Sequence, residues 1–406
     1  MVLGAFGDPG HAFPVIALGR SLAARGHDVT VQTWKRWREA IEGEGLRFCP
    51  APEYQVFPTE SRPMKPYEAV VHAARAAVPV LKELRPDVVV ADILTLAPAL
   101  AAELIDVPVA TLIPHLYPVG ERGLPTYSIG ARRPRTAVGR AFWQRLEFVT
   151  ERGLRQGREE LNGTRSRLGL PSLSAFHGGI SRSLTLVATF PQLEYPRAWP
   201  SHVSVVGPLM WEPPSEDVEL PPGDAPLVLI APSTAQDPEH RMLSAALRGL
   251  ADAPVRVLAV ANHRAPPRPL AVPDNARLVD WLSYSRTMPR CDVVVCHVGH
   301  GTLARALASG CVIVACPAAG DMAESAARLD WAGLGVRVPR RFIAPRPLRL
   351  AVERALADTA MRERVKALAA WSSEHNAGAQ AGGLIERLVA TEEKLRGWDS
   401  NPQHHG

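Results

Sequence analysis

The sequence predicts an α/β protein of two doubly wound domains that face a central cleft. Three observations support this prediction. Apolar strand-like runs alternate with amphipathic helical runs along most of the 406 residues, as in parallel sheets joined by crossover helices. A proline-rich stretch at residues 191–226 interrupts the alternation, which then restarts. The chain is also longer than one hydrophobic core usually organises.

The first domain begins with a strand expected at residues 2–6. The helix after it places Val15, Leu18 and Leu22 on one face, and Gly26 is suited to end it. Further strands are expected at residues 27–33, 87–92 and 108–113, with helices at 67–84 and 96–105.

The proline-rich stretch is interpreted as an interdomain linker wrapped around one strand, residues 203–207. The second domain follows, with strands expected at 227–231, 255–260, 292–297 and 312–316 and helices at 238–251, 303–310 and 323–333. The predicted domains are therefore residues 1–200 and 201–380. In residues 381–406 we expect a helix that returns toward the first domain, and a disordered tail after Trp398.

The composition is that of a soluble globular protein, with 46% hydrophobic and 21% charged residues. The formal net charge of +5 comes from arginines scattered among acids, so nothing indicates a nucleic-acid partner. We expect no secretory leader, because the apolar strand is not preceded by a basic n-region or a small-residue cleavage site, and no membrane insertion, because no run of about eighteen apolar residues occurs. We expect a cytoplasmic protein, monomeric or homodimeric.

The five cysteines predict neither disulfides nor a metal site. There is no CxxC motif. Cys291 and Cys296, like Cys311 and Cys316, lie five residues apart along predicted strands, which would point each pair to opposite faces. We expect buried, inert thiols.

The glycines of the opening stretch do not form a dinucleotide fingerprint. Gly4, Gly7 and Gly10 are spaced G-x-x-G-x-x-G, and the second strand ends in Gln32 and Thr33 without a carboxylate. A nicotinamide or flavin site requires G-x-G-x-x-G and an acid at that strand end. The stretch therefore predicts no such cofactor.

His11 and Asp92 are the candidate reactive residues of the first domain. His11 lies where the first strand turns into the first helix, whose opening turn suits Pro14, and Asp92 ends a buried strand. Both side chains can reach the same rim of a parallel sheet, and an imidazole oriented by a carboxylate is a general-base arrangement. The alternatives are a capping or partly exposed histidine and a helix N-cap aspartate.

The second domain carries a candidate anion site in "CHVGHGT". His297 closes a strand, the glycines form a turn, and a helix is expected to begin near Thr302. Free backbone N–H groups and the helix dipole suit a diphosphate, to which His297 can donate a further hydrogen bond. Ordinary loop geometry is the alternative.

Residues 280–336 resemble the donor-binding signature of family-1 glycosyltransferases of the GT-B fold, which has two Rossmann-like domains. The actinobacterial enzymes that decorate antibiotics and other natural products are the most similar. "GHAFPVIALGRSLAARGHDVT" resembles their opening "GHxxP" element, and "VVGPL" and "APSTAQDPE" resemble the start of their second domain. The resemblance therefore covers most of the chain.

The resemblance implies that His11 is the catalytic base and Asp92 its partner, with the first domain binding the acceptor and the second the donor. It implies donor contacts to the nucleobase, phosphates and sugar from Ser233, Thr234, Trp281, Leu282, His297, Gly299, Gly301, Thr302, Asp321 and Met322.

Two residues depart from the family pattern. Met322 stands where many relatives have Gln, and a thioether cannot hydrogen-bond sugar hydroxyls in the same way. Arg305 stands where many have a ribose-binding Glu, so that contact is lost or replaced. Glucose or a deoxysugar, and uracil or thymine, remain open.

The resemblance implies an inverting, metal-independent transfer from a UDP- or TDP-sugar to a hydroxyl of a small apolar acceptor, without a resident cofactor. Residues 54–67 and 115–133 are expected to form the acceptor pocket, where Phe57, Tyr117 and Tyr127 pack on the aglycone. These rings are alternatively ordinary core or surface aromatics. A non-catalytic auxiliary homologue and a nucleotide-sugar 2-epimerase are rival functions, but "GHAFP" and Asp92 favour transfer.

Overall fold

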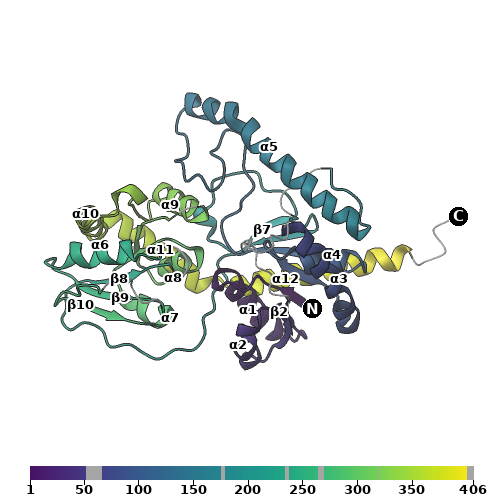
Figure 1. The fold of residues 1–406 in the computed structure, drawn as a ribbon, viewed down its shortest axis with the longest axis horizontal. Coiled ribbons are helices and arrows are strands. Elements are labelled where there is room, and N and C mark those ends of the chain that lie inside the picture. The colour runs from purple at the N-terminus through teal and green to yellow at the C-terminus, as the bar shows by residue number, and fades with distance from the viewer. Residues whose placement is uncertain (52–65, 175–178, 234–236, 264–268, 319, 400–406) are drawn as a thin grey trace.

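The computed structural model describes residues 1–399 except 52–65, 175–178, 234–236, 264–268 and 319. Two wholly parallel sheets form two α/β domains (Figure 1), which confirms the predicted fold class. Parallel strands covered by helices on both faces are continuously apolar, and most strands here are buried along their whole length.

The first sheet has seven strands in the order β3-β2-β1-β4-β5-β6-β7. Its strands are β1 (Val2–Gly4), β2 (Thr30–Thr33), β3 (Arg47–Pro50), β4 (Val89–Asp92), β5 (Val109–Ile113), β6 (Leu184–Val187) and β7 (Val203–Val205). The helices among them are α1 (Pro9–Ala23), α2 (Arg38–Gly43), α3 (Pro66–Leu84), α4 (Leu96–Glu103) and α5 (Ala137–Leu168), with short 3-10 helices η1 (Lys35–Trp37) and η2 (Pro191–Leu193).

The second sheet has six strands in the order β10-β9-β8-β11-β12-β13. Its strands are β8 (Leu227–Ala231), β9 (Arg256–Val260), β10 (Ala276–Val279), β11 (Val293–Cys296), β12 (Val312–Ala315) and β13 (Gly335–Arg337). The helices are α6 (Arg241–Leu250), α7 (Tyr284–Thr287), α8 (His300–Ala308), α9 (Asp321–Ala332), α10 (Pro345–Ala357), α11 (Thr359–Glu374) and α12 (Ala377–Asp399), with η3 (Met288–Arg290) and η4 (Arg340–Phe342).

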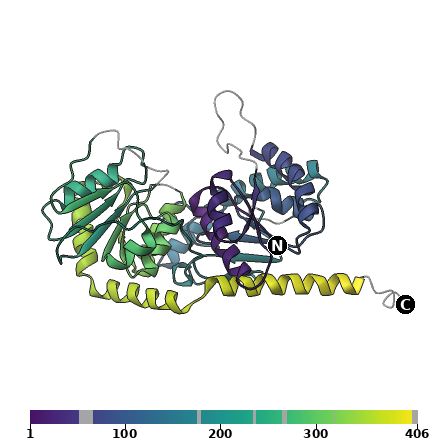
Figure 2. The same cartoon turned by 90° about the horizontal axis from the view of Figure 1, so that it is seen from below.

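The helix α12 leaves the second domain and runs along the first (Figure 2). Its apolar residues Ala381, Ile385 and Leu388 join the core formed around β1, β2 and α1. Glu386 on the same helix accepts hydrogen bonds from Arg25, at 2.8 Å from Nε. The last helix therefore ties the two domains together.

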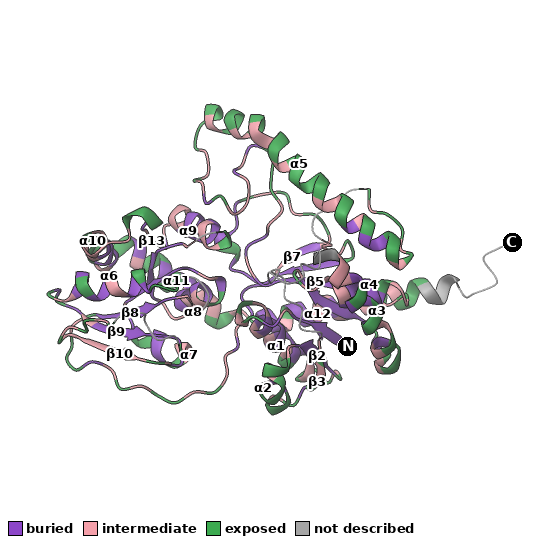
Figure 3. Cartoon of the chain, viewed as in Figure 1, coloured by how far each residue is buried: buried purple, intermediate pink, exposed green. Residues whose placement is uncertain are grey.

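The long helix α5 was not predicted from the sequence. It stands away from the sheets and is exposed over most of its surface (Figure 3), so it lacks the apolar stripe that the periodicity argument requires. The sequence marks only the two ends of α5, with a capping residue at its start and a glycine after its last residue. The Thr136 hydroxyl accepts a hydrogen bond from the Gly139 N–H, and Gly169 ends the helix at φ 77°.

The position of Pro14 corrects the sequence prediction. The proline of the opening turn of α1 is Pro9, whereas Pro14 lies inside the helix. Because Pro9 already begins the helix, His11 lies in its first turn.

The described part of the chain contains no helix with the length and apolar character needed to cross a membrane. The cysteines at 291, 296, 311 and 316 are buried and free. Cys291 and Cys311 precede their strands instead of lying within them. The expected alternation between faces therefore does not apply to these two pairs.

Candidate functional site

The glycines after β1 allow close packing of the loop that carries His11. A Cβ on Gly7 would lie 1.9 Å from the Trp34 ring, and a Cβ on Gly4 would lie 2.6 Å from Pro98. The Trp37 indole N–H donates to the Gly7 carbonyl at 2.7 Å. These glycines therefore serve the approach of aromatic and proline side chains.

His11 and Asp92 form one unit at the carboxyl edge of the first sheet. β1 and β4 are neighbouring parallel strands, so the residues that follow them meet at this edge. The His11 Nδ1 lies 2.8 Å from Asp92 Oδ1. The Asp92 side chain is fully buried, and its Oδ2 accepts from the Phe6 backbone N–H at 3.2 Å and the Thr95 hydroxyl at 3.3 Å.

These contacts fix the state of the His11 ring. A carboxylate only accepts, so Nδ1 carries the proton and Nε2 keeps a lone pair when the ring is neutral. Burial lowers the pKa of His11, but the negative charges of Asp92, Asp8 and Asp321 outweigh it, and the pKa lies above 6.5. The ring can accept a proton at Nε2 and hold the resulting charge against Asp92.

Asp321 brings the second domain to this site. It is the first residue of α9, after Gly320 at φ 58°, and its charge acts on His11. Met322 follows it, and its Cε lies 3.7 Å from where a Cβ on Gly299 would be. The beginnings of α8 and α9 therefore lie next to each other, as sugar and diphosphate contacts would require.

The turn before α8 is strained. Val298 is buried and has φ 55°, a conformation that costs a β-branched residue about 1–3 kcal/mol. Gly299 caps α8, and the Leu303 N–H makes a helical bond to the Gly299 carbonyl at 3.0 Å. The N–H groups of His300, Gly301 and Thr302 thus precede the helical ladder, which suits an anion.

His297 is more buried than the sequence suggests. It is 3% exposed, its Nδ1 accepts from the Ser233 N–H at 2.9 Å, and its Nε2 lies 3.6 Å from Asp237 Oδ2. Burial raises the pKa of Asp237, but His297 and the N–H groups of Met242 and Arg241 lower it to about 2. In this arrangement the His297 ring supports the Ser233 loop.

Trp281 and Leu282 are both expected to contact the donor, and the structure gives their side chains different surroundings. The Trp281 ring is half-buried and stacks on His263, with ring centres 4.8 Å apart and an angle of 4° between the planes. Leu282 packs inside the second core. Its side chain is therefore part of the core, and a donor contact at this position stays a prediction.

Glu212 is a linker residue that sequence reasoning missed. It accepts from the Ser285 N–H at 3.0 Å and from the Ser283 hydroxyl at 2.5 Å. Burial lowers the pKa of Arg305 below its usual value, and the nearby charge of Glu212 opposes this effect. Many relatives have a Glu where this chain has Arg305 on α8. Here the linker places the carboxylate of Glu212 near that position.

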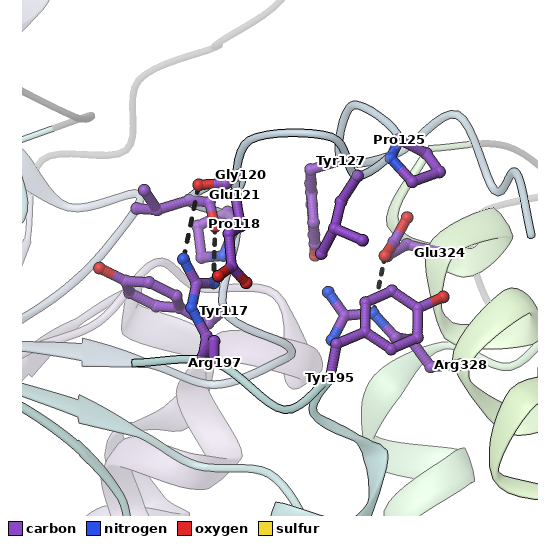
Figure 4. Close-up of a pocket in the computed structure, with 12 residues that line it drawn as sticks. Tyr117, Pro118, Gly120, Glu121, Pro125, Tyr127, Tyr195, Arg197, Glu324 and Arg328 are labelled. Atoms are coloured by element: carbon purple, nitrogen blue, oxygen red, sulfur yellow. Dashed lines mark hydrogen bonds and ion pairs between the residues drawn. The ribbon is translucent and has the colours of Figure 1, made fainter. Parts of the chain in front are cut away.

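Tyr117 and Tyr127 line one small hollow between the domains, with a volume of about 20 Å³ (Figure 4). Tyr117 is buried, and its ring packs against Trp199 and Arg197. Burial raises the pKa of Tyr127, whose hydroxyl lies 3.3 Å from His115 Nδ1. The second domain contributes side chains of α9 to the pocket wall. Phe57 and Thr234 lie outside the described residues.

Within the described ranges, no group of three or more His, Cys, Asp or Glu side chains is arranged to hold a metal ion. Burial raises the pKa of the Cys291 thiol, and so does the Asp292 charge, to about 12. Its sulfur donates to the Thr287 carbonyl. This cysteine is a core residue.

Two family models match the chain. Residues 1–111 match the glycosyltransferase family 28 N-terminal domain, and residues 244–381 match the C-terminal domain of erythromycin biosynthesis protein CIII-like proteins. A 4'-demethylrebeccamycin synthase of Lentzea aerocolonigenes is 28% identical, with 94% of this chain and 97% of that protein covered. The O-mycaminosyltylonolide 6-deoxyallosyltransferase of Streptomyces fradiae is also 28% identical, with 95% and 96% covered.

Solved structures share the fold. The calicheamicin glycosyltransferase CalG4 superposes with a TM-score of 0.74 at 23% identity, covering 96% of this chain and 98% of that one. The glycosyltransferase VinC in complex with dTDP gives 0.69 at 18% identity, with 96% and 99% covered.

The two facing sheets and these matches make the chain a glycosyltransferase of the GT-B fold. Over nearly its whole length it is similar to natural-product glycosyltransferases of actinobacteria.

Proposed function

We propose that this glycosyltransferase moves a sugar from a UDP- or TDP-sugar to a hydroxyl of a small apolar natural product, with inversion and without a metal ion. The observation that carries the proposal is the 2.8 Å contact between His11 Nδ1 and the buried Asp92. It leaves the His11 Nε2 as a base close enough to the second domain for the charge of Asp321 to act on it.

The reaction follows from that base. The His11 Nε2 takes the proton of the acceptor hydroxyl as its oxygen attacks the anomeric carbon. Asp92 stabilises the imidazolium that forms. Because the acceptor oxygen displaces the nucleotide directly, with no enzyme nucleophile, one displacement inverts the anomeric centre.

The donor side supplies charge stabilisation for the leaving nucleotide. The free N–H groups at the start of α8 face developing negative charge with the positive end of the helix dipole. We assign the phosphate contacts to Ser233, Gly301 and Thr302 and the sugar contact to Asp321. The exposed face of Trp281 is assigned to the nucleobase, and Glu212 beside Arg305 to the ribose.

The apolar acceptor is supported by the relatives and by the aromatic side chains near His115. The two curated relatives described above are named for rebeccamycin and tylosin-type products. The Tyr127 hydroxyl lies 3.3 Å from His115 Nδ1, and aromatic side chains such as Tyr127 and Tyr117 suit contact with an apolar aglycone.

Thermal melting with UDP, TDP, GDP and NAD at equal concentration tests the donor site. At 100 times its dissociation constant, a nucleotide should stabilise the chain by about 2.7 kcal/mol. We expect stabilisation by UDP or TDP that Trp281→Ala removes, because the base loses its stacking partner. The matched control is Trp143→Ala on α5, which should keep the shift. Stabilisation by none of the nucleoside diphosphates would contradict the assignment and favour an auxiliary protein.

A further inference from the structure

A second histidine lies beside the proposed base and has no part in the mechanism above. His115 follows β5, the strand next to β4 that ends in Asp92. Its ring centre is 6.2 Å from that of His11, and the planes meet at 80°. The carboxyl ends of β1, β4 and β5 thus bring two imidazoles and one carboxylate to one rim.

The hydrogen bonds of His115 determine its tautomer. Its Nδ1 lies 2.8 Å from the Leu116 carbonyl oxygen. A carbonyl can only accept, so Nδ1 carries the proton and Nε2 of the neutral ring keeps a lone pair. Burial lowers the pKa of His115, and the neighbouring His11 lowers it further. The ring is therefore neutral near pH 7.

The neutral rings of His11 and His115 are consequently the same tautomer, with the proton on Nδ1. Each ring donates from Nδ1 to a fixed oxygen, and each keeps Nε2 as an acceptor. Among the described residues, neither Nε2 has a hydrogen-bond partner. Both residues are half-buried.

We propose that His115 is a specificity-determining residue that accepts a second hydrogen bond from the acceptor substrate. The preferred acceptors then carry two adjacent donors, namely the nucleophilic hydroxyl on His11 Nε2 and a neighbouring O–H or N–H on His115 Nε2. A vicinal diol, or a hydroxyl next to an N–H, has this pattern. The inference rests on the proposed function and names the substrate class of that site.

The geometry favours this role over a purely structural one. The structural bonds of His115 both involve Nδ1, which contacts the Leu116 carbonyl and lies 3.3 Å from the Tyr127 hydroxyl. Nothing in the described fold uses Nε2. A neutral acceptor without a partner in a cleft costs free energy unless a ligand or water donates to it.

The test compares naphthalene-2,3-diol with 2-naphthol as acceptors. The donor is a sugar nucleotide of whichever nucleotide, UDP or TDP, stabilises the chain in the thermal-melting experiment. His115→Phe removes the Nε2 acceptor and keeps an aromatic ring. We expect it to lower kcat/KM for the diol by about tenfold, the contribution of one hydrogen bond between neutral groups, chiefly through KM. Transfer to 2-naphthol should change less than twofold. His115→Gln, which retains an acceptor oxygen, should restore the preference for the diol in part.

The controls distinguish failure of the proposed role of His115 from failure of the proposed function. His72→Phe, an exposed histidine on α3, should leave both acceptors unaffected. An equal loss with both acceptors, or no loss with either, would overturn the role of His115 while leaving the proposed function in place. Failure of the wild-type chain to glycosylate either naphthol, although UDP or TDP binds, would count against the proposed function itself.

Discussion

His11→Ala lowers kcat for sugar transfer by about 10³-fold, the range expected for loss of a general base, and leaves the affinity for UDP or TDP unchanged. The reason is geometric, since the contacts of His11 with Asp92 and Phe6 lie in the first domain, whereas the diphosphate is assigned to the start of α8. Transfer is measured as nucleotide release with acceptor, and affinity by thermal shift. His72→Ala is the control. A variant that kept about a tenth of the rate would rule His11 out as the base.

The pH dependence provides a second readout of the same pair. His11 must be neutral to take a proton, and its pKa lies above 6.5 because the carboxylates outweigh burial. Activity should therefore fall as the pH drops through a midpoint above 6.5. Asp92→Asn removes the charge that favours the imidazolium, so this midpoint should move to lower pH while the maximal rate falls.

Arg328→Ala is expected to destabilise the fold by about 3–5 kcal/mol, as is typical when one partner of a buried ion pair is removed. The Arg328 Nε donates to Glu324 Oε1 and its guanidinium donates to Glu194 Oε2, each at 2.8 Å. All three residues are buried. Its guanidinium also lies 3.9 Å from the centre of the Tyr195 ring. Glu194 is in the first domain and Arg328 on α9, so the contact joins the domains.

Chemical denaturation of the variant measures this loss. Burial already raises the pKa of Glu194, against the effect of Arg328, and the alanine leaves two buried carboxylates without the cation that hydrogen-bonds to both. The control is the triple variant Arg328→Met, Glu194→Gln, Glu324→Gln, which removes all three charges and should recover most of the stability. A loss below about 1 kcal/mol in Arg328→Ala would mean that water already screens the cluster.

The sequence predicted the sheets well because parallel strands leave a strong signal. Runs such as residues 87–92 and 292–297 are apolar on both faces, and the structure contains β4 and β11 there. The helix α5 was missed because its surface is mostly exposed, and β3 because its residues are largely exposed or half-buried. The strand β6, Leu184–Val187, was missed although it is buried along its whole length, so burial alone does not decide which elements are predictable.

The site residues that lie at the ends of predicted strands were predictable from the sequence. Those whose role depends on contacts with segments distant in the sequence were not. His11 and Asp92 each end or follow a buried strand, and adjacent strands bring them together. Glu212 lies in the linker, where no periodicity predicts its contact with Ser285. Likewise, the position of His297 behind the Ser233 loop depends on packing between β8 and β11, which no local motif encodes.

The configuration of the product tests the central claim most directly. An α-linked UDP- or TDP-glucose is incubated with the wild-type chain and an acceptor that it glycosylates, and the anomeric proton of the product is assigned by NMR. Direct displacement with His11 as base gives a β-glycoside. An α-glycoside would contradict the account, because retention requires a step that the His11 and Asp92 pair does not provide.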